Sequence, residues 1–122
     1  MKNLATASAT EMLKEIGMPA GLLGFAYVRY GIALAVEDAT ILRRMTTALY
    51  PTIAKKFGTT PSRTERCIRH AVEVACDRTT PDVLEKYFGN SMSSSKGKPV
   101  NREFIATLAD RIKVREVVID NG

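Results

Sequence analysis

The sequence has few of the residues that bind metals or form disulfides. It contains two cysteines, Cys67 and Cys76, and one histidine, His70. These three side chains are too few for a metal site with the usual four ligands, so we expect no metal. The cysteines lie nine residues apart on one expected helix, which separates them by about 13–14 Å along its axis. That distance is too long for a disulfide, so we expect two buried thiols of a cytoplasmic protein.

The chain also lacks long apolar runs and catalytic patterns. Its longest apolar run, GLLGFAYV at residues 21–28, is followed by Arg29 and is far shorter than the ~20 residues that span a bilayer. The N-terminus has no apolar segment typical of a secretory signal. No nucleophile is paired with a base around His70, and no glycine-rich phosphate loop occurs. We therefore expect no membrane association, no cofactor and no enzymatic activity.

The patterns that are present are helical nearly throughout. At 122 residues with 45% hydrophobic and 25% charged residues, the chain has the composition of one globular domain. Its apolar spacing predicts an all-α fold, a compact bundle of about six helices that contains a helix-turn-helix. The expected helices cover residues 8–16 with Ser8 as cap, 21–36, 38–49, 51–57, 61–77, 81–89 capped by Thr80-Pro81-Asp82, and 101–115 with Asn101 as cap. The 21–36 helix is apolar nearly all round and should be central, and VVI at 117–119 should form a strand or pack on the core.

The segment from Leu49 to Asp77 is the most informative part of the chain. It predicts a short helix, a turn at Gly58, and a longer helix with Thr60 as N-cap and Pro61 at the first helical position. At 100° per residue, one face of the longer helix is apolar and the opposite face is basic. The apolar face carries Thr64, Ile68, Ala71 and Ala75. The opposite face carries Ser62, Arg66, Arg69 and Glu73, with Arg63 and His70 on one flank and Glu65 on the other. This is the pattern of a helix-turn-helix whose second helix enters the major groove of DNA.

Charge supports the same interpretation. Residues 50–78 hold six basic and three acidic side chains, so they carry +3 of the chain's net +5. Such a concentration is typical of phosphate binding, although a solvated basic helix face is an equally common explanation of it. Glu65 favours base readout, because an acid on a phosphate-binding surface can accept a hydrogen bond from cytosine N4. Arg63 or Arg66 could then read guanine.

Three blocks of sequence resemble one family in order along the chain. They are EIGMPAGLLGFAYVRYGIALA, YPTIAKKFGTTPSRTERCIRHAVEVA and GKPVNREFIATLADRI, and the resemblance covers about residues 3–115. They are similar to the DNA-binding effector domain of the stage-zero sporulation response regulator of endospore-forming Firmicutes. The resemblance implies an all-helical domain that binds TGTCGAA-type boxes, often in tandem. It also implies contact with the RNA polymerase sigma factor through about residues 79–92.

The resemblance assigns roles to individual residues. Arg63, Glu65 and Arg66 match the base-reading positions of the family's SRxER run, and Ser62, Arg69 and His70 match its phosphate-contacting positions. Lys98, and with it Lys96, is also expected to contact phosphates from the 90–99 loop, although a plain solvated loop is an equally good explanation of these residues. Cys67 and Cys76 depart from the alanine and the aromatic residue that are usual at those positions.

We therefore expect residues 1–122 to form a single effector domain without the receiver domain of full-length family members. Its expected partner is double-stranded DNA, with a tandem dimer on DNA as one arrangement. The alternative function is a stand-alone protein-interaction module that uses the same helices to bind an acidic partner and has lost specific DNA binding.

Overall fold

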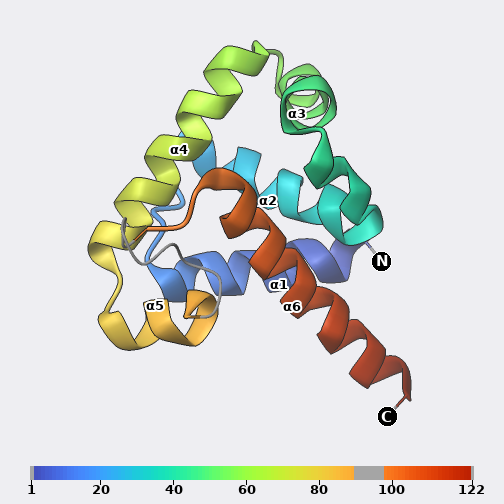
Figure 1. Cartoon of the computed structure of the whole chain (residues 1–122), viewed down its shortest axis with the longest axis vertical. Helices are drawn as coiled ribbons and strands as arrows, with labels where there is room; N and C mark the ends of the chain where they lie inside the picture. The colour runs from blue at the N-terminus through green and yellow to red at the C-terminus, as the bar shows by residue number, and fades with distance from the viewer. Residues whose placement is uncertain (1, 90–97, 122) are drawn as a thin grey trace.

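The computed structural model describes residues 2–89 and 98–121, and every regular element within them is helical. The six α-helices are α1 (Lys2–Ile16), α2 (Leu23–Glu37), α3 (Tyr50–Phe57), α4 (Pro61–Arg78), α5 (Pro81–Phe88) and α6 (Asn101–Asn121). A 3₁₀ helix at Ala39–Arg43 and a π-helical turn at Met45–Leu49 join α2 to α3. No strand occurs in the described ranges, so the predicted all-α bundle is confirmed (Figure 1).

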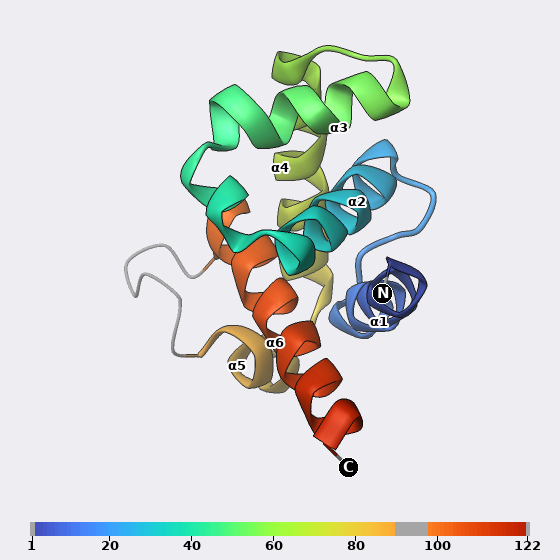
Figure 2. The same ribbon diagram turned by 90° about the vertical axis from the view of Figure 1, so that its right-hand side faces the viewer.

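Helix α2 is the centre of the bundle, as its apolar sequence predicted. It packs against α1, α4 and α6, and Phe25, Val28 and Ile32 are almost completely buried along it. Figure 2 shows α3 lying across one end of α4, while α5 lies near the other end beside α6. This arrangement places α5 and the projecting end of α6 away from the end of the molecule that α3 and α4 form.

The first helix begins earlier than we expected. Ser8 was predicted as its N-cap, but α1 begins at Lys2 and Ser8 is a buried residue within it. The leucine and alanines of the preceding LATA segment favour a helix. The helix therefore begins before Ser8 and continues past it, and the prediction of a cap at Ser8 was wrong.

The predicted helix at 38–49 is not one α-helix. Asp38 is extended, and its carboxylate accepts hydrogen bonds from the backbone N–H of Thr40 at 3.0 Å and from its hydroxyl at 2.6 Å. Such a local bond competes with α-helix formation and here begins the 3₁₀ segment. Arg44, at φ −130° and ψ 55°, interrupts the chain again before the π-helical turn. The apolar spacing of this segment predicts that Ile41, Leu42, Met45 and Leu49 face inward. Met45 and Leu49 are buried, whereas Ile41 and Leu42 are only partly buried.

The last helix also differs from the prediction at both ends. Asn101 is not its cap but its first residue, and its side chain points to Tyr50 instead. The helix continues beyond Arg115 to Asn121, because neither proline nor glycine occurs there to end it. The predicted strand at 117–119 is wrong because these residues belong to α6. Val117 and Val118 are 57% and 63% exposed and make no core contact, and the side chain of Ile119 lies outside the description. The end of α6 projects from the body of the molecule (Figure 1).

Candidate nucleic-acid interface

Helices α3 and α4 form the predicted helix-turn-helix. Gly58 ends α3 in the left-handed region, at φ 68° and ψ 39°, which glycine adopts without steric cost. The Thr60 hydroxyl accepts a hydrogen bond from the backbone N–H of Arg63 at 3.2 Å, and Pro61 begins α4. Both predicted start signals of the second helix are therefore confirmed.

One face of α4 is buried against the bundle. Its buried residues are Thr64, Ile68, Ala71, Val72 and Ala75. The Thr64 hydroxyl is satisfied inside the core because it donates a 2.9 Å hydrogen bond to the carbonyl of Thr60. The burial of this face fixes which side of α4 is presented to solvent.

Glycine sets the distance between α4 and the central helix. A Cβ atom on Gly24 of α2 would lie 2.2 Å from the carbonyl oxygen of Cys67 on α4. The two backbones can approach so closely only because that atom is absent. Phe57 fixes the end of α3 in turn, with its ring centroid 5.0 Å from that of Tyr27 and 5.8 Å from that of Tyr30 on α2.

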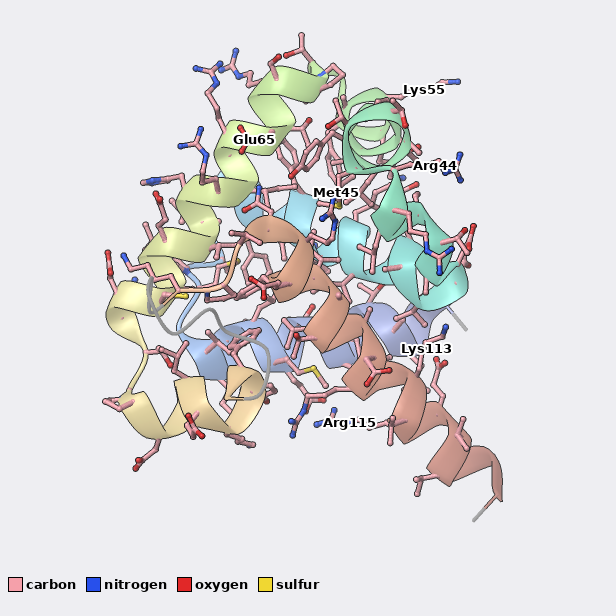
Figure 3. The ribbon with its side chains drawn as sticks, viewed as in Figure 1. Arg44, Met45, Lys55, Glu65, Lys113 and Arg115 are labelled. Carbon is pink, nitrogen blue, oxygen red and sulfur yellow. The ribbon has the colours of Figure 1, made fainter. Side chains whose placement is uncertain are left out.

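The opposite face of α4 exposes the predicted DNA-contacting residues. Ser62, Arg63, Arg66, Arg69 and His70 are all exposed, and Glu65 is partly exposed. Arg66 lies near the middle of this face, with Arg63 and His70 toward one side and Glu65 toward the other. Figure 3 shows Glu65 on this part of α4, at the same end of the molecule as Lys55 of α3.

A hollow lies on each side of this face. Arg63, Arg66 and His70 line one hollow of about 490 Å³ together with residues 21–24 at the start of α2. Ser62, Glu65, Arg66 and Arg69 line the other, of about 380 Å³, together with Thr46 and Tyr50. The structure therefore brings together six of the seven predicted site residues.

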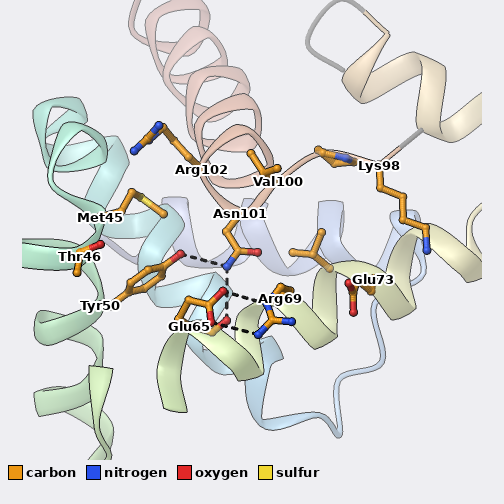
Figure 4. Close-up of a pocket in the computed structure, with 12 residues that line it drawn as sticks. Met45, Thr46, Tyr50, Glu65, Arg69, Glu73, Lys98, Val100, Asn101 and Arg102 are labelled. Carbon is orange, nitrogen blue, oxygen red and sulfur yellow. Dashed lines mark hydrogen bonds and ion pairs between the residues drawn. The ribbon is translucent and has the colours of Figure 1, made fainter. Parts of the chain in front are cut away.

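Glu65 is held on several sides within this face (Figure 4). The Arg69 guanidinium contacts both of its carboxylate oxygens, with Nε 3.0 Å from Oε2 and Nη2 3.4 Å from Oε1. This hydrogen-bonded pairing raises the pKa of Arg69. The Asn101 amide, from α6, donates to the Tyr50 hydroxyl at 3.1 Å and to the backbone carbonyl of Glu65 at 3.5 Å. Burial raises the pKa of Tyr50, and the nearby Glu65 charge adds to that shift.

Lys98, the seventh predicted residue, lies apart from the other six. Its ammonium is 2.7 Å from a carboxylate oxygen of Asp77, near the far end of α4, and this pairing raises the pKa of Lys98. Lys98 and Arg69 line a common groove of about 510 Å³ between α4 and the start of α6. Lys96 and most of the 90–99 loop lie outside the described residues.

Neither cysteine has the environment that we expected. Cys67 and Cys76 are both free, and both are half-buried rather than buried. Burial raises the pKa of the Cys76 thiol, whereas Cys67 lines the hollow beside Arg63 and His70. In the described ranges no group of histidine, cysteine and acidic side chains could hold a metal ion. No helix in that part of the chain is long and apolar enough to cross a membrane.

Sequence reasoning missed the contacts that support the site from behind. Asn101 and Tyr50 are 51 positions apart, and Asn101 and Glu65 are 36 apart. No local pattern indicates either contact, because each depends on how α6 packs against the helix-turn-helix.

Comparison with protein families gives a match over most of the chain. The model of the family described as sporulation initiation factor Spo0A C terminal matches residues 9–112. The matched region contains α2 to α5 entirely and includes the whole exposed face of α4.

Proposed function

The chain belongs to the Spo0A C-terminal family, which comprises DNA-binding domains that regulate transcription in sporulation, and from this premise we propose which DNA it reads and how. We propose that it is a sequence-specific regulator domain that binds a TGTCGAA-type box. Helix α4 enters the major groove with its first turns, while α3 and the start of α2 approach the backbone on either side.

The exposed face at the beginning of α4 is the observation that carries this proposal. Arg63 and Arg66 are exposed in its first two turns, whereas Thr64 and Ile68 of the same part of the helix are buried. In helix-turn-helix proteins the N-terminal residues of the second helix contact base edges. A helix whose inner face is fully packed can present these side chains to DNA without rearrangement of the core.

The residue types suit the roles we assign to them. Arg63 and Arg66 read guanine O6 and N7, and Glu65 accepts a hydrogen bond from cytosine N4. Ser62, Arg69 and His70 contact phosphates, which gives affinity without sequence information. Lys98 adds a phosphate contact further along the duplex.

We also propose contact with two protein partners, an RNA polymerase sigma factor and a second copy of this chain. Helix α5 covers most of the described part of 79–92, the segment that would contact a sigma factor, whereas residues 90–92 lie outside the description. The Lys86 ammonium of α5 is 2.8 Å from a carboxylate oxygen of Glu15 on α1, and Tyr87 also donates to Glu15. This attachment keeps α5 away from the α3–α4 end (Figure 2), so sigma factor and DNA could be bound together. The second copy would bind an adjacent box, so that two copies form a tandem dimer on the DNA.

The proposal is tested by measuring affinity for a TGTCGAA duplex and for a scrambled duplex at about 150 mM salt. We expect a clear preference for the box, and we expect Arg63→Ala or Arg66→Ala to cost about 1–3 kcal/mol on the box alone. Arg115→Ala is the matched control, because it removes the same charge from α6 at a distance from α4 (Figure 3).

Two results would contradict the proposal. Equal losses on both duplexes would restrict Arg63 and Arg66 to phosphate contacts. If the unmodified protein bound both duplexes with equal affinity, sequence-specific binding would be excluded. That result would favour the alternative, a protein-interaction module that uses the same basic face.

A further inference from the structure

Glu65 presents an electrostatic problem on the proposed interface. It is an acid on the face of α4 that meets DNA, where phosphates concentrate negative charge. A carboxylate there is repelled unless a cation compensates it, and it contributes specificity only if its orientation is fixed. The structure offers one side chain that does both.

Arg69 lies one helical turn beyond Glu65 and donates a hydrogen bond to each of its two carboxylate oxygens. Each carboxylate oxygen can accept two hydrogen bonds, so one acceptor site on each oxygen is left for a base. A guanidinium carries five N–H donors, and only two are used by Glu65. Arg69 can therefore hold Glu65 and still face a phosphate.

The backbone of Glu65 is also fixed. Asn101 donates to its carbonyl from α6, and the same amide is anchored by the Tyr50 hydroxyl (Figure 4). The carboxylate is thus held by Arg69 and the main chain by Asn101, before any DNA is bound.

We propose that Arg69 is a positioning residue for Glu65: it orients the Glu65 carboxylate toward a cytosine N4 amino group and compensates its charge. The inference rests on the proposed function and deepens it. It assigns to Arg69 a share of the sequence discrimination, whereas a residue that contacts only phosphates would have none.

The test compares two duplexes, the TGTCGAA box and the same box in which the cytosine of the TGTCGAA strand and its paired guanine are replaced by a T·A pair. The proteins are the unmodified chain, Glu65→Gln, Arg69→Ala, Arg69→Lys and the Glu65→Gln/Arg69→Ala double variant. We expect the unmodified chain to prefer the cytosine box by about 5- to 150-fold. Arg69→Ala should lose most of this preference, and the double variant should discriminate no worse than Glu65→Gln alone, because both changes remove one coupled unit.

Arg69→Lys separates positioning from simple charge. A lysine ammonium keeps the positive charge but cannot form the bidentate hydrogen bonds that a guanidinium makes to a carboxylate. We expect it to retain the dependence of affinity on salt while its preference for cytosine stays well below that of the unmodified chain. Arg115→Ala, on the same two duplexes, should leave the preference unchanged. Thermal unfolding of each variant establishes that the fold is intact.

The outcomes are distinguishable. If Arg69→Ala weakens binding equally on both duplexes while Glu65→Gln loses the preference, Arg69 contacts only phosphate and the inference is wrong, although the proposed function stands. If Glu65→Gln keeps the full preference, Glu65 reads no base and the inference is again wrong. If the unmodified chain shows no preference for the box over scrambled DNA, the proposed function itself fails.

Discussion

The crossing of α2 and α4 at Gly24 makes a quantitative prediction about stability. In Gly24→Ala the new Cβ atom would lie 2.2 Å from the carbonyl oxygen of Cys67 and 2.7 Å from the Cβ of Ala71. Neither atom can rotate away, because one is backbone and the other is fixed to it. Ordinary contact begins at 3.4 Å, so the two helices must separate by about 1.2 Å at this point.

The balance of two effects gives the expected size. Alanine stabilises a helix relative to glycine by at most about 1 kcal/mol. Forcing an additional carbon into a packed interface typically costs about 1–3 kcal/mol, and more when backbone must move. Because backbone must move here, we place the overpacking cost near the upper end of this range, about 2–3 kcal/mol, so Gly24→Ala should be destabilising overall by about 1–2 kcal/mol. This lowers Tm by roughly 3–5 °C per kcal/mol for a domain of this size. It should also weaken DNA binding, because the displaced helix is α4.

Urea and thermal unfolding measure this effect against two matched variants. A Cβ on Gly21 would meet nothing within 4 Å, so Gly21→Ala should leave stability nearly unchanged. A Cβ on Gly31 would meet the flexible ends of three side chains, Ile53 at 3.3 Å, Ile105 at 3.4 Å and Leu49 at 3.9 Å, so Gly31→Ala should cost less than Gly24→Ala. If Gly24→Ala were as stable as the unmodified protein, the close crossing of α2 and α4 would be refuted.

Three further predictions concern single contacts. Thr60→Ala should lower the free energy of unfolding by about 1 kcal/mol because α4 loses its N-cap. Thr60→Ser should keep the N-cap and most of that stability. If both variants lost equal stability in urea unfolding, the hydroxyl would not be the cap. Burial and the bond to Glu15 raise the pKa of Tyr87 to about 12, so folding favours the protonated phenol. Stability should therefore fall between about pH 10 and pH 12, and unfolding measured across that range should show a smaller fall in Tyr87→Phe. Lys98→Ala should reduce the magnitude of the slope of log affinity against log salt by about one on any duplex. An unchanged slope would show that Lys98 contacts no phosphate.

The sequence predicted the elements whose signals are local. Thr60-Pro61 and Thr80-Pro81 each place a capping hydroxyl before a proline that fits the first helical turn. The structure confirms both caps, at the starts of α4 and α5. Gly58 ends α3 for an equally local reason, because the left-handed conformation there suits glycine.

The incorrect predictions came from signals with two interpretations. Ser8 resembles a helix cap in sequence, but the side chain is buried within α1, where neighbouring leucine and alanine decide the conformation. Asp38 was included in a helix by apolar spacing, although its carboxylate bonds to Thr40 and begins a 3₁₀ segment instead. Periodicity describes which face is buried, as at Met45 and Leu49, but does not determine the type of helix.

The site was predictable in its exposed residues but not in its support. The period of α4 identified Arg63, Glu65 and Arg66 as solvent-facing, because a helix with one apolar face must present the opposite one. The bond from Asn101 to Tyr50 depends on tertiary packing between segments far apart in the chain. Sequence periodicity carries no information about such a contact.

The central claim, that α4 reads bases in the major groove, is tested most directly by altering a single acceptor of the DNA there. Replacing a guanine of the TGTCGAA box by 7-deazaguanine removes the N7 acceptor in the major groove and leaves base pairing intact. We expect affinity to fall, but by less than the about 5- to 150-fold that a whole bidentate pair is worth, because the arginine keeps its bond to O6. Replacing the arginine that reads this guanine, Arg63 or Arg66, by alanine should then cost less on the substituted box than on the natural one. Unchanged affinity at every guanine of the box would contradict arginine readout in the major groove.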